Sequence, residues 1–187
     1  MTNTNRSRQY IQRIIDQHQQ ISNVTCIPSA VEMVLKLLGK VETDYCDLQN
    51  RWTIGSFANF DGQTVSGVTF QRINLAERSP TFPFDQLFRI IDQELASDRY
   101  VIVSLFGMSS EGPSFHAYVI FDEDRVHNDY FAVTKASLNG RYVTQFDENI
   151  KERVRRIQGT DILVYTLTST QDGTEEHGRK EEEEKKN

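Results

Sequence analysis

The stretch "HQQISNVTCIPSAVEMVLKLLG", residues 18–39, decides how the rest of this chain is interpreted. After Pro28 its apolar residues recur at helical spacing, and Gly39 is a natural end for a helix. Proline fits the first helical turn, because a nitrogen there has no intrahelical hydrogen bond to lose. The pattern predicts a buried helix with Cys26, one of 2 cysteines in the chain, at its N-terminus.

The elements expected on either side of this helix differ in kind. Helical spacing predicts three more helices, at residues 6–17, 84–97 and 146–157. Residues 44–79 are the least regular part, with a helix-like start and a loop-like continuation. Short β-branched and aromatic stretches predict strands at residues 100–106, 116–124, 129–137, 141–146 and 161–169. Helices first and an antiparallel sheet afterwards indicate an α+β fold.

We expect three regions along the 187 residues. Residues 1–17 form an N-terminal helical extension and residues 18–169 form one domain. Residues 170–187 carry almost no apolar side chain, so they cannot repay their ordering entropy and are expected to be a disordered charged tail.

The composition limits which binding partners and which cellular compartment are expected. A formal net charge of −6 and a pI of about 5.3 give no electrostatic grip on nucleic acid or anionic lipid. The N-terminus lacks the apolar segment of a secretory signal, and the longest apolar run is too short to cross a bilayer. Two cysteines make neither a disulfide framework nor a metal set. We expect a cytoplasmic protein without metal or cofactor; the sequence leaves the oligomeric state open.

Cysteine chemistry would need three groups. At a helix N-terminus, backbone amides and the helix dipole favour the thiolate of Cys26. Of the 4 histidines, His18 and His177 lie in polar segments and His127 lies in a turn. His116 opens an apolar strand after a Gly/Ser/Pro-rich loop, which suits a base that faces a cleft. Gln20, six positions before the cysteine, is the candidate donor to an oxyanion.

The order Gln-x5-Cys at a helix start, followed much later by a histidine heading a strand, resembles the papain-like cysteine peptidase superfamily. Within it, "QISNVTCIPSAVEMVLKLLG" and "SFHAYVIFDED" are most similar to the bacterial branch of bacteriocin leader-processing peptidase domains. The resemblance covers residues 18–168 in order and spacing. It implies a papain-like fold with Cys26 as nucleophile, His116 as general base and acid, and Gln20 as oxyanion donor.

Two positions depart from that family. Ile27 follows the cysteine, where the family usually has Gly. The family's Asp or Asn that orients the imidazole is replaced by Thr134 and Lys135 in the next strand. The candidates for a third member are the Thr134 hydroxyl and, if the preceding turn folds back, Asn128.

Several functions stay open. The leading hypothesis is a cysteine hydrolase that cleaves an amide bond in a peptide or protein substrate through a thioester. With an amine in place of water, the same site would be a transglutaminase-type acyltransferase. A catalytically silent papain-like domain would instead bind a peptide or protein. An α+β domain without cysteine chemistry would be favoured if His116 faced the other side of the sheet.

Overall fold

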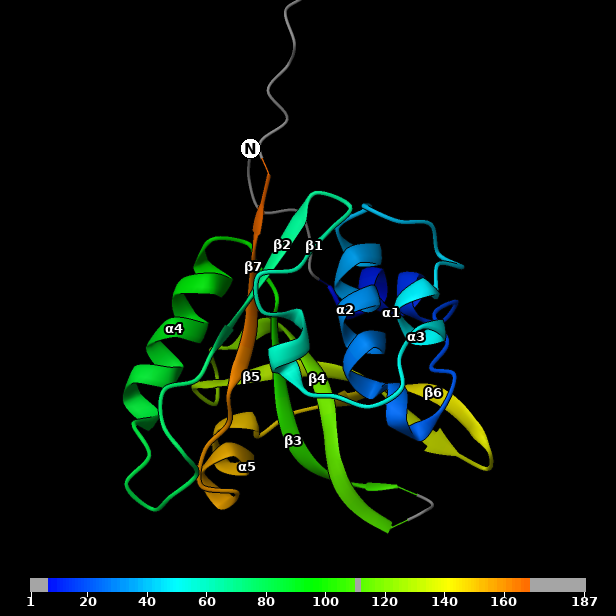
Figure 1. Ribbon diagram of the computed structural model, residues 1–187. Coiled ribbons are helices and arrows are strands. Elements are labelled where there is room, and N and C mark those ends of the chain that lie inside the picture. The colour runs from blue at the N-terminus through cyan, green and yellow to red at the C-terminus, as the bar shows by residue number, and fades with distance from the viewer. Residues whose placement is uncertain (1–6, 110–111, 169–187) are drawn as a thin grey trace, which may run out of the picture.

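The structure, a computed structural model, describes residues 7–109 and 112–168 (Figure 1). The expected tail at 170–187 and the first residues of the expected extension lie outside these ranges. The elements in chain order are α1 (Arg8–Ile15), a 3-10 turn η1 (Asn23–Thr25), α2 (Cys26–Leu37), α3 (Asp47–Asn50), η2 (Phe57–Phe60), β1 (Thr64–Val65), β2 (Val68–Ile73), α4 (Phe84–Ala96), β3 (Val101–Ser109), β4 (Gly112–Asp124), β5 (Asp129–Leu138), β6 (Arg141–Asp147), α5 (Ile150–Arg156) and β7 (Ile162–Leu167).

The predicted α+β class is confirmed. One seven-stranded sheet runs in the order β1-β2-β7-β3-β4-β5-β6, and every neighbouring pair is antiparallel. Strand β7, the last element of the described residues, therefore lies inside the sheet, between β2 and β3.

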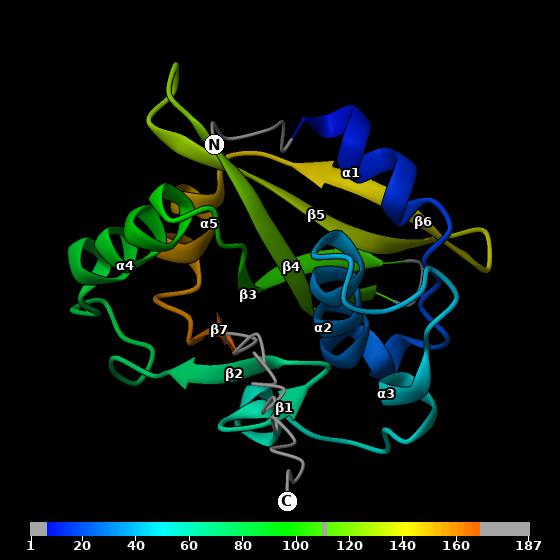
Figure 2. The ribbon, with the colours of Figure 1, turned by 90° about the horizontal axis from the view of Figure 1, so that it is seen from above.

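Helices cover both faces of the sheet. In Figures 1 and 2, α1 and α2 lie on one side of the strands and α4 and α5 on the other. Each side has its own core: α1, α2 and side chains such as Val119 and Phe121 form one, and α4, α5 and side chains such as Tyr118 and Ile120 form the other. Successive residues of β4 alternate between the two cores, as pleating requires.

The central helix α2 begins at Cys26, as expected, and ends in a glycine motif. Gly39 has φ +64°, its N–H donates to the Lys36 carbonyl, and the Lys40 N–H donates to the Leu35 carbonyl. These two bonds satisfy carbonyls that the end of a helix leaves unpaired. Ten of the 12 residues of α2 are buried, including the charged side chains of Glu32 and Lys36. A helix covered on nearly all sides holds its first residue firmly in place.

Two expectations about strands were wrong in detail. Residues 68–73, assigned to an irregular region, form β2, which pairs with β7 along six residues. The Gly/Ser/Pro-rich segment before His116 is not a loop up to that residue, because β4 already begins at Gly112 and pairs with β3. His116 therefore lies within a long strand and does not open it. Long-range pairing overrides the local turn signals here.

Candidate functional site

The candidate site lies where β4 and β5 separate. Their ladder runs from Asp124–Asp129 to Val119–Val133. Beyond Val119, toward the start of β4, each strand stays paired only with its outer neighbour, β4 with β3 and β5 with β6. Main-chain groups of β4 and β5 that no longer bond each other here bond side chains instead. Such an opening offers main-chain donors and acceptors to side chains in the middle of a sheet.

Three side chains enter this opening. The Thr134 Oγ1 hydroxyl donates to the Ala117 carbonyl at 2.7 Å. The Nε2 atom of His116 lies 2.7 Å from the Lys135 carbonyl oxygen. The backbone N–H of Ala117 hydrogen-bonds the Cys26 sulfur. Cys26 and His116 are thus brought to the same short segment of β4.

The thiol of Cys26 is half-buried and unbridged. Burial raises the pKa of Cys26, although hydrogen bonds from the backbone N–H groups of Ala117, Ile27 and Cys26 itself act in the opposite direction. The helix N-terminus was expected to lower this pKa. The desolvation of the thiolate outweighs that effect, so the resting group is a neutral thiol.

The imidazole of His116 is oriented by a main-chain carbonyl. A carbonyl accepts but cannot donate, so the 2.7 Å contact with Lys135 assigns the proton of the neutral ring to Nε2. Nδ1 is then left with the lone pair that a base needs. Burial lowers the pKa of His116, while the bond to Lys135 and the charge of Asp147 oppose this shift. The resting imidazole is therefore also neutral.

The two groups are not directly bonded. Within residues 7–109 and 112–168, no hydrogen bond joins the Cys26 sulfur to the His116 ring. His116 also shares the alternation of Tyr118, which belongs to the core of α4 and α5, whereas α2 packs on the other face. This placement is the one that favours the alternative of an α+β domain without cysteine chemistry. Because β4 leaves β5 at this point, the ring lies in the opening itself.

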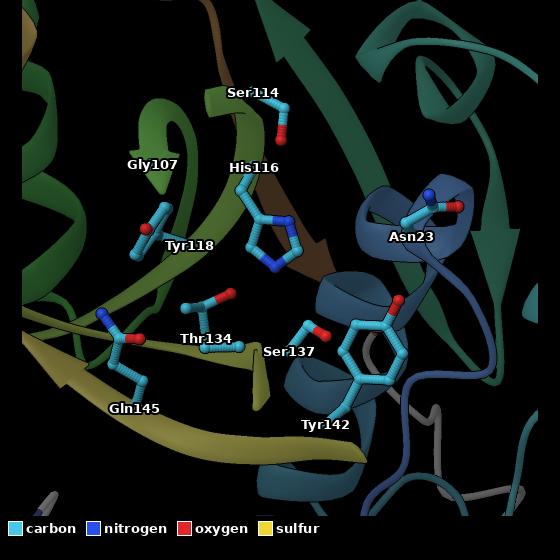
Figure 3. Close-up of a pocket in the computed structure, with 10 residues that line it drawn as sticks. Asn23, Gly107, Ser114, His116, Tyr118, Thr134, Ser137, Tyr142 and Gln145 are labelled. Atoms are coloured by element: carbon cyan, nitrogen blue, oxygen red, sulfur yellow. The ribbon is translucent and has the colours of Figure 1, made fainter. Parts of the chain in front are cut away.

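A small pocket of about 40 Å³ adjoins His116 (Figure 3). Its lining comes from η1, β3, β4, β5 and β6 and consists of uncharged groups beside the imidazole: Asn23, Gly107, Ser114, Tyr118, Thr134, Ala136, Ser137, Tyr142 and Gln145. In Figure 3 the ring stands in the middle, with one nitrogen toward Thr134 and Ser137 and the other toward the side of Asn23. The lining offers many hydrogen-bonding groups without a fixed charge.

The expected oxyanion donor, Gln20, is occupied within its own turn. Its side chain is buried and Nε2 donates to the Ser22 carbonyl at 2.8 Å. It lines a different pocket, together with His18 and Tyr142. Asn23, one turn before Cys26, lines the pocket of His116 and was missed by sequence reasoning. Its signal was an amide side chain three positions before the cysteine.

The two expected third members lie in different places. Asn128 is in the turn between β4 and β5, where its Oδ1 accepts from Lys151 Nζ at 3.1 Å. Asp124, next to that turn, is eight positions from His116 along β4, roughly 26 Å in an extended strand. Thr134 lies in the site but donates to Ala117, not to the ring. The acceptor that holds the imidazole is the carbonyl of Lys135.

A buried polar network secures the loop before Cys26. Gln49 Nε2 donates to the Gln19 carbonyl at 2.9 Å and to Glu32 Oε2 at 2.6 Å. Its Oε1 accepts from the Ile21 N–H at 2.9 Å and from the Thr25 hydroxyl at 3.0 Å. One side chain, 2% exposed, thus uses both its donors and both its acceptor positions to hold residues 19–25 against α2.

A second buried group centres on His18, which sequence reasoning had set aside as part of a polar segment. Its side chain is 1% exposed; Nε2 contacts Ser29 Oγ and Nδ1 contacts Lys36 Nζ, both at 2.8 Å. Burial and the charges of Lys36 and Lys135 lower the pKa of His18 to about 3. Burial likewise lowers the pKa of Lys135 to about 8, and its Nζ donates to Thr144 at 3.1 Å.

The fold and the site define an α+β protein with helices on both faces of a seven-stranded antiparallel sheet and a Cys26–His116 opening between two strands. Comparison of the chain with protein-family models, curated proteins and solved structures found no match. In the described part of the chain, no helix is long and apolar enough to cross a membrane. Among the same residues, no group of three or more His, Cys, Asp or Glu side chains is arranged so that it could hold a metal ion.

Proposed function

We propose that this protein is a thiol hydrolase that cleaves an amide bond in a peptide or protein, with Cys26 as nucleophile and His116 as general base and acid. The observation that carries the proposal is the 2.7 Å contact between His116 Nε2 and the Lys135 carbonyl. It holds the ring in the tautomer whose Nδ1 is free to accept a proton, in the strand whose Ala117 N–H contacts the Cys26 sulfur.

The reaction follows from these positions. On substrate binding, His116 Nδ1 takes the thiol proton and the Cys26 sulfur attacks the amide carbonyl, which forms a tetrahedral oxyanion. His116 returns the proton to the nitrogen as the C–N bond breaks, which leaves a thioester and a free amine. His116 Nδ1 then takes a proton from water, and the resulting hydroxide attacks the thioester. As the C–S bond breaks, the imidazolium returns the proton to the Cys26 sulfur, which leaves the thiol and a carboxylic acid that ionises to the carboxylate.

Main-chain groups supply the remaining functions in this proposal. The Lys135 carbonyl takes the orienting role that Asp or Asn has in papain-like enzymes. The backbone amides of Cys26 and Ile27, already directed at the sulfur, are suited to donate to the oxyanion. Asn23, which lines the pocket of His116, is a side-chain donor for the same charge. An amine acceptor in place of water would make the same site a transferase.

A second candidate function is a silent domain that binds a peptide or protein. It is favoured by the raised pKa of Cys26 and by the lack of a hydrogen bond between the thiol and the imidazole in the described residues. In such a domain Cys26 would be a buried packing residue beside a polar pocket.

The rate of Cys26 alkylation by iodoacetamide, measured between pH 5 and 10, separates the two. A Cys46→Ser background removes the other thiol, and His127→Ala, an exposed histidine on a distant turn, serves as the matched control. If His116 is the base, His116→Ala slows alkylation near pH 7 by about tenfold or more, and His127→Ala does not. Equal rates in His116→Ala and its parent at every pH would exclude the hydrolase and leave the binding domain.

A further inference from the structure

The His116 ring contacts Tyr118, which belongs to a side-chain cluster drawn from three elements. Tyr118 lies two residues along β4, and its ring meets that of His116 edge to face, with centroids 5.9 Å apart and planes at 83°. Arg153 comes from α5 and Asp147 from the end of β6. We call Tyr118, Arg153 and Asp147 the Arg153 cluster.

Tyr118 is held so that its ring cannot easily move. It is 3% exposed, and its hydroxyl lies over Gly107 of β3. A Cβ atom at position 107 would lie 2.9 Å from that hydroxyl oxygen, closer than real Cβ atoms approach. Glycine at this position therefore provides the space for the hydroxyl.

Arg153 joins the cluster to the sheet. Its Nη2 donates to the Tyr118 hydroxyl and to the Phe106 carbonyl, both at 3.1 Å. Its Nη1 pairs with Asp147 Oδ1 at 3.3 Å, and its guanidinium carbon lies 4.7 Å from the Tyr118 ring centroid. Both side chains of the ion pair are only 20% exposed, so solvent screens this pair less than a surface pair. One guanidinium thus connects β3, β4, β6 and α5 beside the imidazole.

We propose that Arg153 is a positioning residue for His116: through Tyr118 it holds the imidazole in place, and through Asp147 it sets how readily the ring accepts a proton. This inference rests on the proposed function for its importance. The property that is tested, the pKa of the His116 imidazole, does not depend on Cys26. The ammonium of Lys135, on the other face of β5, is occupied by Thr144. The Cys26 thiol is neutral at rest. Among the described residues, the charge found to act on His116 is that of Asp147, and Arg153 is paired with Asp147.

The opposite charges of Asp147 and Arg153 predict opposite changes in the pKa of His116, which a purely structural role of the cluster would not produce. The negative charge of Asp147 acts to raise the pKa of His116, and Arg153 is its countercharge. Removal of the carboxylate should therefore lower the pKa of His116, whereas removal of the guanidinium should raise it. A cluster that only supports the packing would give shifts in the same direction from both changes, or none.

The test is an NMR titration of the His116 Cε1–H signal in the full-length protein, with Asp147→Asn, Arg153→Gln and the parent compared. We expect shifts of opposite sign, each about 0.5 pH unit. Arg156→Gln is the matched control, because Arg156 lies on the same helix and pairs only with exposed Glu152 among the contacts described for it. It should leave the titration unchanged.

Shifts of the same sign, or no shift in either variant, would overturn the inference. If Arg153→Gln does not fold, Asp147→Asn alone decides, because it must lower the pKa of His116. Arg153→Lys, which keeps the charge but loses the two-pronged donor, should keep the pKa near that of the parent. The titration reads His116 without reference to Cys26, so a failed alkylation test refutes the hydrolase and leaves this result standing.

Discussion

The hydrogen bonds of Gln49 make a quantitative prediction about the segment that positions Cys26. Gln49→Leu keeps the size of the side chain but removes its contacts with Gln19, Ile21, Thr25 and Glu32. A buried polar group that loses its partner costs about 1–3 kcal/mol. The four partners do not all contribute equally to that loss.

Three of the four partners are partly compensated. Gln19 and Ile21 are exposed residues and their main-chain bonds to Gln49 are only partly buried, so water can replace part of these bonds. The Thr25 hydroxyl has one hydrogen, which can go wholly to the Ser22 carbonyl at 2.9 Å once Gln49 is replaced. Glu32 is fully buried and keeps bonds only from the Leu48 and Gln49 N–H groups among those described. We therefore expect Gln49→Leu to lower the free energy of unfolding by about 3 kcal/mol, less than four full penalties.

Urea denaturation followed by circular dichroism measures this loss. For a domain of this size, about 3 kcal/mol corresponds to a fall in Tm of about 6–12 °C. Gln93→Leu, at an exposed position of α4, is the matched control and should cost less than about 0.5 kcal/mol. A loss below about 1 kcal/mol for Gln49→Leu, or one equal to that of Gln93→Leu, would refute the network's role. The looser 19–25 segment should also make half-buried Cys26 alkylate faster.

Three more predictions follow from buried groups. The folded-state pKa of His18, about 3, lies below its unfolded value of 6.5. The contribution of neutral His18 to stability is therefore complete above pH 6.5 and is lost as the pH falls toward 3. By NMR the His18 ring should not titrate between pH 5 and 8, whereas exposed His127, whose pKa is raised by Asp124, should titrate in that range. Gly107→Ala should destabilise the protein by about 1–2 kcal/mol in thermal unfolding, because its Cβ meets the Tyr118 hydroxyl, and Tyr118→Phe in the same chain should recover part of that loss. Thr134→Val, which leaves a buried carbonyl of β4 without its 2.7 Å bond, should cost about 1–2 kcal/mol in urea denaturation, and no measurable cost would show that the bond does not hold the strands.

The α+β class and the central helix could be predicted from the sequence because their signals are local. The apolar spacing after Pro28 and the glycine at 39 determine where α2 runs and ends, whatever packs against it. Five strand predictions overlap β3, β4, β5, β6 and β7 for the same reason. Cys26 at the start of that helix was likewise visible from its neighbours in the chain.

Only the tertiary structure decided how the candidate site is made. The order of strands, with β7 between β2 and β3, depends on pairing between residues that are far apart in the chain, such as Val68 with Leu167. The separation of β4 from β5 leaves main-chain groups open, and one of them, the Lys135 carbonyl, holds His116. Every residue has such main-chain groups, so the residue types in the sequence do not indicate which of them will be used. The pKa of Cys26 is raised in the folded protein, whereas the sequence predicted a lowered one, because burial depends on everything packed around the thiol and outweighs the local effect of the helix N-terminus.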